Sequence, residues 1–170
     1  LVLKVGTRFL LVQCISAKRE MQRMSLGKIV EVDLTEGKVT ARDYSAETVR
    51  TYLGGLGFNS WYLYEHISSQ HGALDPENVL AISCGLLTGT AAPASSRIQI
   101  SAKSPLSGLM GSSNVGGFFG VRLRACGIRS ILICGRSKHP VFLSLSPEGI
   151  EIRDAEELWG LDTHETEEHL

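Results

Sequence analysis

The 170-residue sequence lacks several patterns that would assign a function class directly. No apolar run approaches the ~20 residues of a membrane-spanning helix, so we expect no membrane partner. The formal net charge is −1 and no basic run is interleaved with aromatic residues, which argues against a nucleic-acid partner. The nucleophile elbow GxSxG, the Walker A motif and HExxH are also missing. The residues alone therefore contain no self-contained catalytic set.

Cysteine is sparse and poorly spaced for a metal site or a disulfide framework. The four cysteines are Cys14, Cys84, Cys126 and Cys134, and none belongs to a CxxC pair. Their spacings match no zinc or iron–sulfur pattern. The apolar run from Phe9 to Val12 is too short for a signal peptide. We therefore expect reduced thiols and a cytoplasmic protein.

The pattern predicts one α+β domain, with largely antiparallel β-sheets and a few short helices. Residues 1–24 have no clean period, and we interpret them as a non-native N-terminal extension, with Met24 or Met21 as the natural start, or as a disordered lead. Residues 25–170 form the predicted domain. Its last helix is capped by Asp162 or Thr163 and stops at Leu170, which predicts a domain that is incomplete at its C-terminus.

Alternating apolar residues and turn signals place the strands. The predicted hairpin and strands are 27–44, 79–82, 98–101, 131–134, 141–145 and 150–153. Because the last three are closely spaced, we expect them to form an antiparallel meander.

Helix signals place three further segments. Ser45 is expected to cap a helix over 46–53, which the glycines of 54–57 then end. Asn59 or Ser60 is expected to begin the next helix. A third helix is predicted over 118–126, with Phe118, Val121, Leu123 and Ala125 facing inward and Arg122 and Arg124 facing outward or towards a ligand.

The run from Gly85 to Gly127 is rich in glycine, serine and threonine. Arg97 is the lone cation between Gly85 and Ala102, and Gly116 and Gly117 directly precede the third predicted helix. Free backbone N–H groups at a helix start favour an anion. The run fits either an anion site or ordinary turns between strands, and composition alone leaves both open.

Six motifs in this order resemble the N-terminal domain of the aldehyde ferredoxin oxidoreductase family of tungsten-pterin enzymes. They are GKIVEVDLTEGKV at 27–39, YLGGLGF at 52–58, GLLTGTAAPASSR at 85–97, AKSPLSG at 102–108, SNVGGFFG at 113–120 and RDAEELWG at 153–160. The resemblance covers residues 27–170.

The resemblance implies a role for this domain as the base on which a tungsten (or molybdenum) bis-pterin cofactor lies. Arg97 then corresponds to the arginine between the pterin and a [4Fe–4S] cluster. Asn114 corresponds to the residue whose backbone carbonyl helps to hold a Mg²⁺ ion between the pterin phosphates. Gly116 and Gly117 lie in the loop that contacts the cofactor. None of the four is implied as a catalytic residue.

Two departures from the family pattern bear on function. Leu56 stands where many members carry arginine, which puts the substrate or partner subclass in doubt. The four cysteines here do not match the family's cluster cysteines, which belong to later regions. The resemblance thus implies that the fragment alone is inactive.

The implied parent oxidises an aldehyde to a carboxylic acid and passes electrons to ferredoxin, with a homodimer among the assemblies that the resemblance allows. Two alternatives stay open: a stand-alone glycine-rich ligand-binding module and a non-functional gene fragment.

Overall fold

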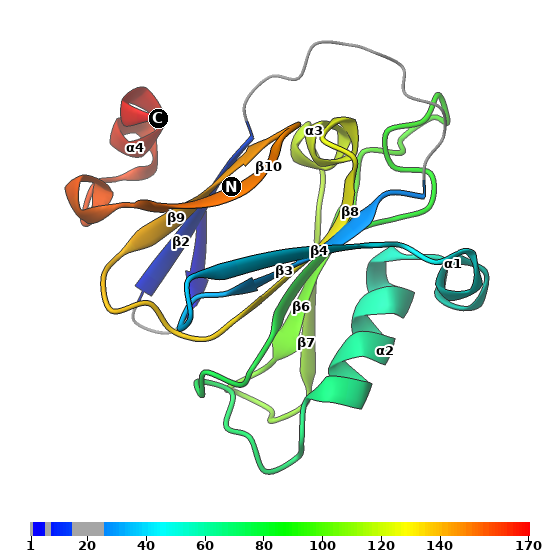
Figure 1. The fold of residues 1–170 in the computed structure, drawn as a ribbon, viewed down its shortest axis with the longest axis horizontal. Helices are drawn as coiled ribbons and strands as arrows, with labels where there is room; N and C mark the ends of the chain where they lie inside the picture. The colour runs from blue at the N-terminus through cyan, green and yellow to red at the C-terminus, as the bar shows by residue number, and fades with distance from the viewer. Residues whose placement is uncertain (1, 6–7, 15–25) are drawn as a thin grey trace.

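The computed structural model describes residues 2–5, 8–14 and 26–170, with side chains described from Leu26 onward. Met21 and Met24, the two internal candidates for a natural start, lie outside these ranges. Two β-sheets meet face to face, and the two helices within residues 46–66 cover the outer side of the larger sheet (Figure 1). The elements are β1 (Val2–Val5), β2 (Arg8–Cys14), β3 (Lys28–Asp33), β4 (Lys38–Asp43), α1 (Ala46–Tyr52), α2 (Gly55–His66), β5 (Leu80–Cys84), β6 (Ile98–Lys103), β7 (Met110–Val115), α3 (Phe119–Ala125), β8 (Ile128–Cys134), β9 (Val141–Ser146), β10 (Gly149–Asp154), the 3₁₀ turn η1 (Glu156–Leu158) and α4 (Thr163–His169).

The strand orders confirm the predicted α+β class with largely antiparallel pairing. The larger sheet has the order β4-β3-β8-β5-β6-β7, and the smaller has β1-β2-β9-β10. Only the β3–β8 and β2–β9 pairs are parallel among the described strands. Strands β1 and β2 belong to the 1–24 segment, and whether that segment is native stays a prediction.

The predicted meander of the last three strands is wrong. Strand β8 lies between β3 and β5 in the larger sheet, whereas β9 and β10 form a hairpin in the smaller one. Almost every residue of β8 is buried, so this strand needs cover on both faces and takes a central position. Its short distance in sequence from β9 does not decide its partner.

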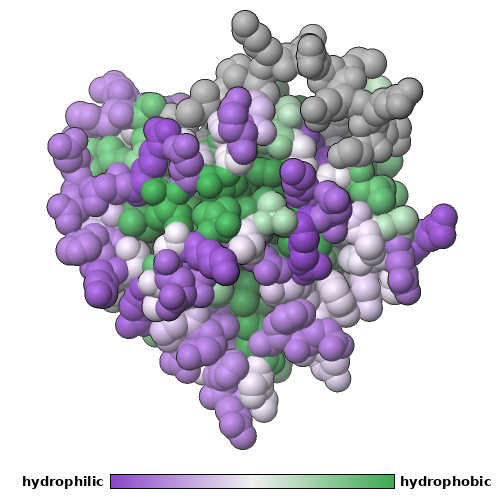
Figure 2. Space-filling view, in the orientation of Figure 1, coloured by the Kyte–Doolittle hydropathy of each residue, from purple (hydrophilic) through white to green (hydrophobic). Residues whose placement is uncertain are grey.

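The packing divides into two apolar clusters, one on each face of the larger sheet. The first lies between the sheets and joins Val32 and Ile131 to Leu143 and Leu145 of β9. The second contains Phe58, Tyr62 and Leu63 of α2, packed on the outer face. Figure 2 shows apolar side chains gathered in the middle of one face and framed by polar ones. No helix in the described part of the chain is long and apolar enough to cross a membrane.

Helix α2 begins at Gly55, so the expected start at Asn59 or Ser60 is wrong. The glycines of 54–57 do not form a loop between α1 and α2. They form the sharp turn between the two helices and the first turn of α2. Leu53 ends α1 in the left-handed region (φ 62°), and Gly54 continues the turn at φ 96°. Asn59 consequently lies inside α2, where it is fully buried.

The predicted inward side of helix α3 is confirmed at Leu123 but is wrong at Phe118 and Val121. Phe118 is 81% exposed and Val121 lies at the surface, whereas Leu123 is fully buried. Gly120 allows the close approach, because a Cβ there would lie 2.7 Å from Ile98 Cγ2. The inward side is therefore centred on Gly120 and Leu123, and Arg124 is half-buried.

Candidate functional site

One end of the larger sheet gathers the glycine-bearing segments of the chain. The register aligns Cys84 with Ile98, and Ile98 with Val115. The next residues at this end are Gly85, Arg97 and Gly116, which follow or precede the three strands. Helix α2 begins beside them, because a Cβ added at Gly55 would lie 3.6 Å from the Gly85 Cα. We call Gly54, Gly55, Gly85, Gly116 and Gly117 the glycine end.

The two sequence-predicted side chains Arg97 and Asn114 are in direct contact at this end. Arg97 Nη1 donates to Asn114 Oδ1 at 2.6 Å. Asn114 Nδ2 in turn donates to Gln99 Oε1 at 3.0 Å. Arg97 and Asn114 are exposed, and among the described residues no carboxylate pairs with Arg97. The guanidinium is thus oriented by a neutral amide and keeps its net charge for a ligand.

A row of polar side chains links this pair to the interior. Gln99 donates to Ser112 Oγ, and the hydroxyls of Ser112 and Ser101 are 3.3 Å apart. Buried Asn59 then donates to Ser101 Oγ and to the Ala81 carbonyl, both at 3.1 Å. Helix α2 therefore fixes strand β6, and β6 fixes the position of Asn114.

The other two predicted residues, Gly116 and Gly117, lie between β7 and α3. A Cβ at either position would meet no heavy atom within 4 Å, so the space above this backbone is open. Gly117 has φ 92°, a conformation that other residues rarely adopt. A bulky ligand can approach this backbone closely. Helix α3 has only seven residues, so we assign no anion site to its N-terminus.

Arg129 is a residue that the sequence interpretation missed. It is 3% exposed, and its Nε donates to the Leu26 carbonyl at 2.5 Å. Its Nη1 donates to the Gly85 carbonyl at 3.2 Å, and its guanidinium lies 5.6 Å from the centre of the Tyr44 ring. The available signal was a single charged residue, Arg129, within the largely apolar strand that follows Gly127.

The electrostatics of this end are positive, because Arg97 and Arg129 have no carboxylate partner among the residues whose side chains are described. Burial lowers the pKa of both Arg124 and Arg129, yet a guanidinium stays protonated in proteins. Burial raises the pKa of the nearby Cys84 thiol to about 12, so this thiol is neutral. An anionic ligand would therefore meet no competing protein anion from these groups.

The residues present fit a large phosphorylated cofactor better than a metal held by side chains. The described residues contain no group of three or more His, Cys, Asp or Glu that could hold a metal ion. A Mg²⁺ ion would instead use carbonyl and phosphate oxygens, which are ligands it prefers. Asn114 belongs to β7, which has a free outer edge among the described strands. The assignments of Arg97, Asn114, Gly116 and Gly117 stay predictions.

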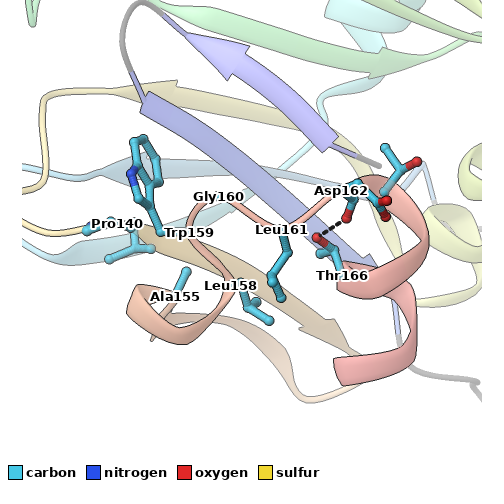
Figure 3. Close-up of a pocket in the computed structure, with 10 residues that line it drawn as sticks. Pro140, Ala155, Leu158, Trp159, Gly160, Leu161, Asp162 and Thr166 are labelled. Carbon is cyan, nitrogen blue, oxygen red and sulfur yellow. Dashed lines mark hydrogen bonds between the residues drawn. The ribbon is translucent and has the colours of Figure 1, made fainter.

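A second feature is a pocket of about 310 Å³ between β9, η1 and α4 (Figure 3). Its lining includes Pro140, Trp159, Leu161 and Thr166, and Figure 3 shows the Trp159 and Leu161 side chains at its wall. None of the sequence-predicted site residues lines it. It is therefore separate from the glycine end.

Comparisons with known proteins show similarity over most of the chain. Residues 29–170 match the family described as "Aldehyde ferredoxin oxidoreductase, N-terminal domain". The chain is 39% identical over 144 residues to the tungsten-containing aldehyde ferredoxin oxidoreductase of Pyrococcus abyssi, covering 85% of this chain and 24% of that protein. It is 34% identical over 138 residues to the WOR-like subunit of an aliphatic sulfonate oxidoreductase of Pyrococcus furiosus, covering 79% of this chain and 22% of that subunit.

A solved structure is similar over the same region. It is the active site complex BamBC of benzoyl coenzyme A reductase in complex with 1,5-dienoyl-CoA, with a TM-score of 0.82 and 36% identity. The likeness covers 85% of this chain and 22% of that one. The chain spans about a quarter of the length of the relatives it matches. By this match, which covers nearly the whole described domain, the chain belongs to the aldehyde ferredoxin oxidoreductase family and corresponds to its N-terminal domain.

Proposed function

We propose that this chain is the cofactor-base domain of a tungsten- or molybdenum-pterin oxidoreductase. In this proposal the whole protein oxidises an aldehyde to a carboxylic acid and transfers the electrons through a [4Fe–4S] cluster to ferredoxin. The observation that carries it is the exposed Arg97–Asn114 pair beside the open backbone of Gly116 and Gly117. The names of the relatives, which are tungsten-containing oxidoreductases, support the redox class.

The chain's own residues would bind and orient the cofactor. Arg97 would donate to its polar edge on the side of the cluster, because a guanidinium supplies several fixed donors. The carbonyl of Asn114 would bind Mg²⁺, and the backbone at Gly116 and Gly117 would approach the cofactor without a side chain between them. The cofactor, when bound, would supply the two-electron redox chemistry.

The proposal includes partners and location. Ferredoxin or a related carrier would accept the electrons, a small aldehyde would be the substrate, and the protein would act in the cytoplasm, as a homodimer or in another assembly. The free thiols of Cys84 and Cys134 are compatible with a reducing compartment.

The test uses the full-length protein from a host that makes the pterin cofactor. We expect tungsten or molybdenum on elemental analysis and aldehyde-dependent reduction of benzyl viologen. A protein with neither metal nor activity would contradict the proposal. A metal-free chain that still binds a phosphorylated ligand would favour the ligand-binding module instead.

A further inference from the structure

Arg129 owes its position to an irregularity in the sheet. In the β3–β8 pair, Lys28 aligns with Ile128 and Ile29 with Ser130, so Arg129 is an extra residue. Such bulges re-aim side chains and occur often beside functional sites. Ile128 packs into the core between the sheets, whereas Arg129 lies against Tyr44 on the outer face. Without the bulge, strict alternation would have placed Arg129 in the inter-sheet core.

The contacts of Arg129 join segments that are far apart in sequence. Its Nε and Nη1 donate to the carbonyls of Leu26 and Gly85, which are 103 and 44 residues away. A Cβ at Gly54 would lie 2.8 Å from the Cys84 carbonyl oxygen and 3.8 Å from Arg129 Nη1. One side chain therefore connects the approach to β3, the corner before α2 and the start of the β5–β6 loop.

Burial of the charged Arg129 guanidinium costs free energy at this position. Within the part of the chain whose side chains are described, no carboxylate pairs with it. The N-terminus of the twelve-residue helix α2 begins beside it and has no acidic residue in its first turn. The positive end of a helix dipole repels a cation. Carbonyl contacts and the Tyr44 ring offset only part of this cost, whereas an anion at the glycine end would offset more.

We propose that Arg129 is a positioning residue that holds the Gly85 and Leu26 carbonyls and thereby fixes the glycine end in its anion-binding arrangement. This inference rests on the proposed function, because the anion would be the phosphorylated part of the cofactor. It assigns Arg129 no contact with the reacting atoms.

The first experiment measures hydrogen exchange in the 170-residue chain and its Arg129→Lys and Arg129→Met variants. Methionine fills the space but leaves both carbonyls without a donor, and lysine keeps the charge but cannot donate to both at once as the fork does. We expect exchange at 26–28, 54–57 and 85–90 to rise about tenfold in Arg129→Met and less in Arg129→Lys. Exchange in the β9–β10 hairpin should not change.

Arg136→Met is the matched control. Arg136 Nη2 donates to the Leu74 carbonyl at 3.0 Å, and it follows the other end of β8. The Arg136→Met substitution therefore removes the same kind of hydrogen bond, from a guanidinium to a backbone carbonyl, at a place away from the glycine end. An equal rise throughout the domain in Arg129→Lys, or no local rise in either Arg129 variant, would overturn the positioning role.

The second experiment titrates inorganic pyrophosphate into the same proteins and follows the amide resonances of Gly116 and Gly117. We expect Arg129→Met to weaken binding about tenfold, Arg129→Lys to restore most of it, and Arg136→Met to leave it unchanged. The amide resonances of Gly54 and Gly85, which lie beside Arg129, are followed as well. A purely structural role would leave the affinity of the folded protein equal in all of them. That result, or no binding to the unmodified chain, would overturn the inference. Neither measurement depends on tungsten. Failure of the Arg129 inference can therefore be distinguished from failure of the proposed oxidoreductase function.

Discussion

The Arg97 side chain donates to the side-chain amide of Asn114, and this contact determines which effects its removal should have. The Arg97–Asn114 bond of 2.6 Å continues through Gln99 into polar side chains of β6 and β7, and Arg97 itself is exposed. Removing the exposed side chain should therefore change the site much more than the fold. This separation makes the residue a useful test of the cofactor interpretation.

In the full-length protein, we expect Arg97→Ala to shift the reduction potential of the cluster and to lower turnover at least tenfold, while the tungsten content falls less. The reason is that a guanidinium beside the cluster stabilises its reduced, more negative state. Spectroelectrochemistry and a viologen assay measure the two effects. Arg97→Lys, which keeps the charge, should retain most of the potential. Unchanged potential and turnover in Arg97→Ala would contradict the predicted position between pterin and cluster.

Cys84 gives a prediction of pH dependence. Burial raises its pKa from 9.0 in the unfolded chain to about 12 in the folded one. The folded state then holds this proton more tightly, so the contribution of Cys84 to stability is constant below pH 9 and falls as the pH rises from 9 to 12. The expected slope is about 1.4 kcal/mol per pH unit. Urea unfolding at several pH values measures it, and Cys84→Ala should show a slope smaller by this amount. Equal slopes would show that the thiol does not contribute.

At the scale of single residues, the sequence predicted the site residues that belong to motifs. It missed the residue whose orientation depends on the register between two strands. Arg97 and Asn114 were chosen from motifs, and the structure brings them together. Arg129 was not chosen, because its orientation depends on a bulge opposite β3, a strand about a hundred residues earlier. No local pattern contains that information.

At the scale of elements, helix caps were predictable because they are local. Ser45 Oγ accepts from the Thr48 amide at 2.9 Å, as expected for the start of α1. Asp162 forms a full capping box with Glu165 at the start of α4. The corner between α1 and α2 was not predictable in the same way. Its glycines suggested a break, whereas they allow close packing of one helix on the end of the other.

Substitution by alanine should have different effects on stability at two glycines of this fold. A Cβ at Gly57 would overlap the Tyr52 carbonyl oxygen, so Gly57→Ala should destabilise the chain by about 1–3 kcal/mol. Gly116 has open space around its Cα, so Gly116→Ala should change stability by less than about 0.5 kcal/mol. Urea unfolding measures both. In the full-length protein, Gly116→Ala should still lower cofactor content, and normal content would argue against contact at this position.

At the scale of the whole molecule, the class of the fold followed from short strands and turn signals, but its topology did not. Strand β8 lies beside β3 and β5. Strand β3 precedes it by roughly 100 residues and β5 by roughly 50. Alternation identifies a strand and its buried face, yet it is silent about which strand lies beside it. The parallel β3–β8 pair is what brings Arg129 next to Leu26 and closes the glycine end.

We expect the inter-sheet core to make the two sheets unfold as one cooperative unit. Leu145 of β9 is fully buried in the cluster that also contains Val32 and Ile131 of the larger sheet. Leu145→Ala should therefore cost about 2–5 kcal/mol, because it removes apolar contacts and leaves a cavity between the sheets. Leu106→Ala is the control, since Leu106 is 96% exposed and its change should cost little.

The Leu145 prediction also concerns how the molecule unfolds. If the shared core couples the sheets, Leu145→Ala should lower hydrogen-exchange protection in β5 and β6 as much as in β9, and urea unfolding should stay a single transition. Loss of protection confined to β9 and β10 would mean that the smaller sheet opens on its own. The glycine end would then depend only on the larger sheet, on the loops that adjoin its strands and on α2.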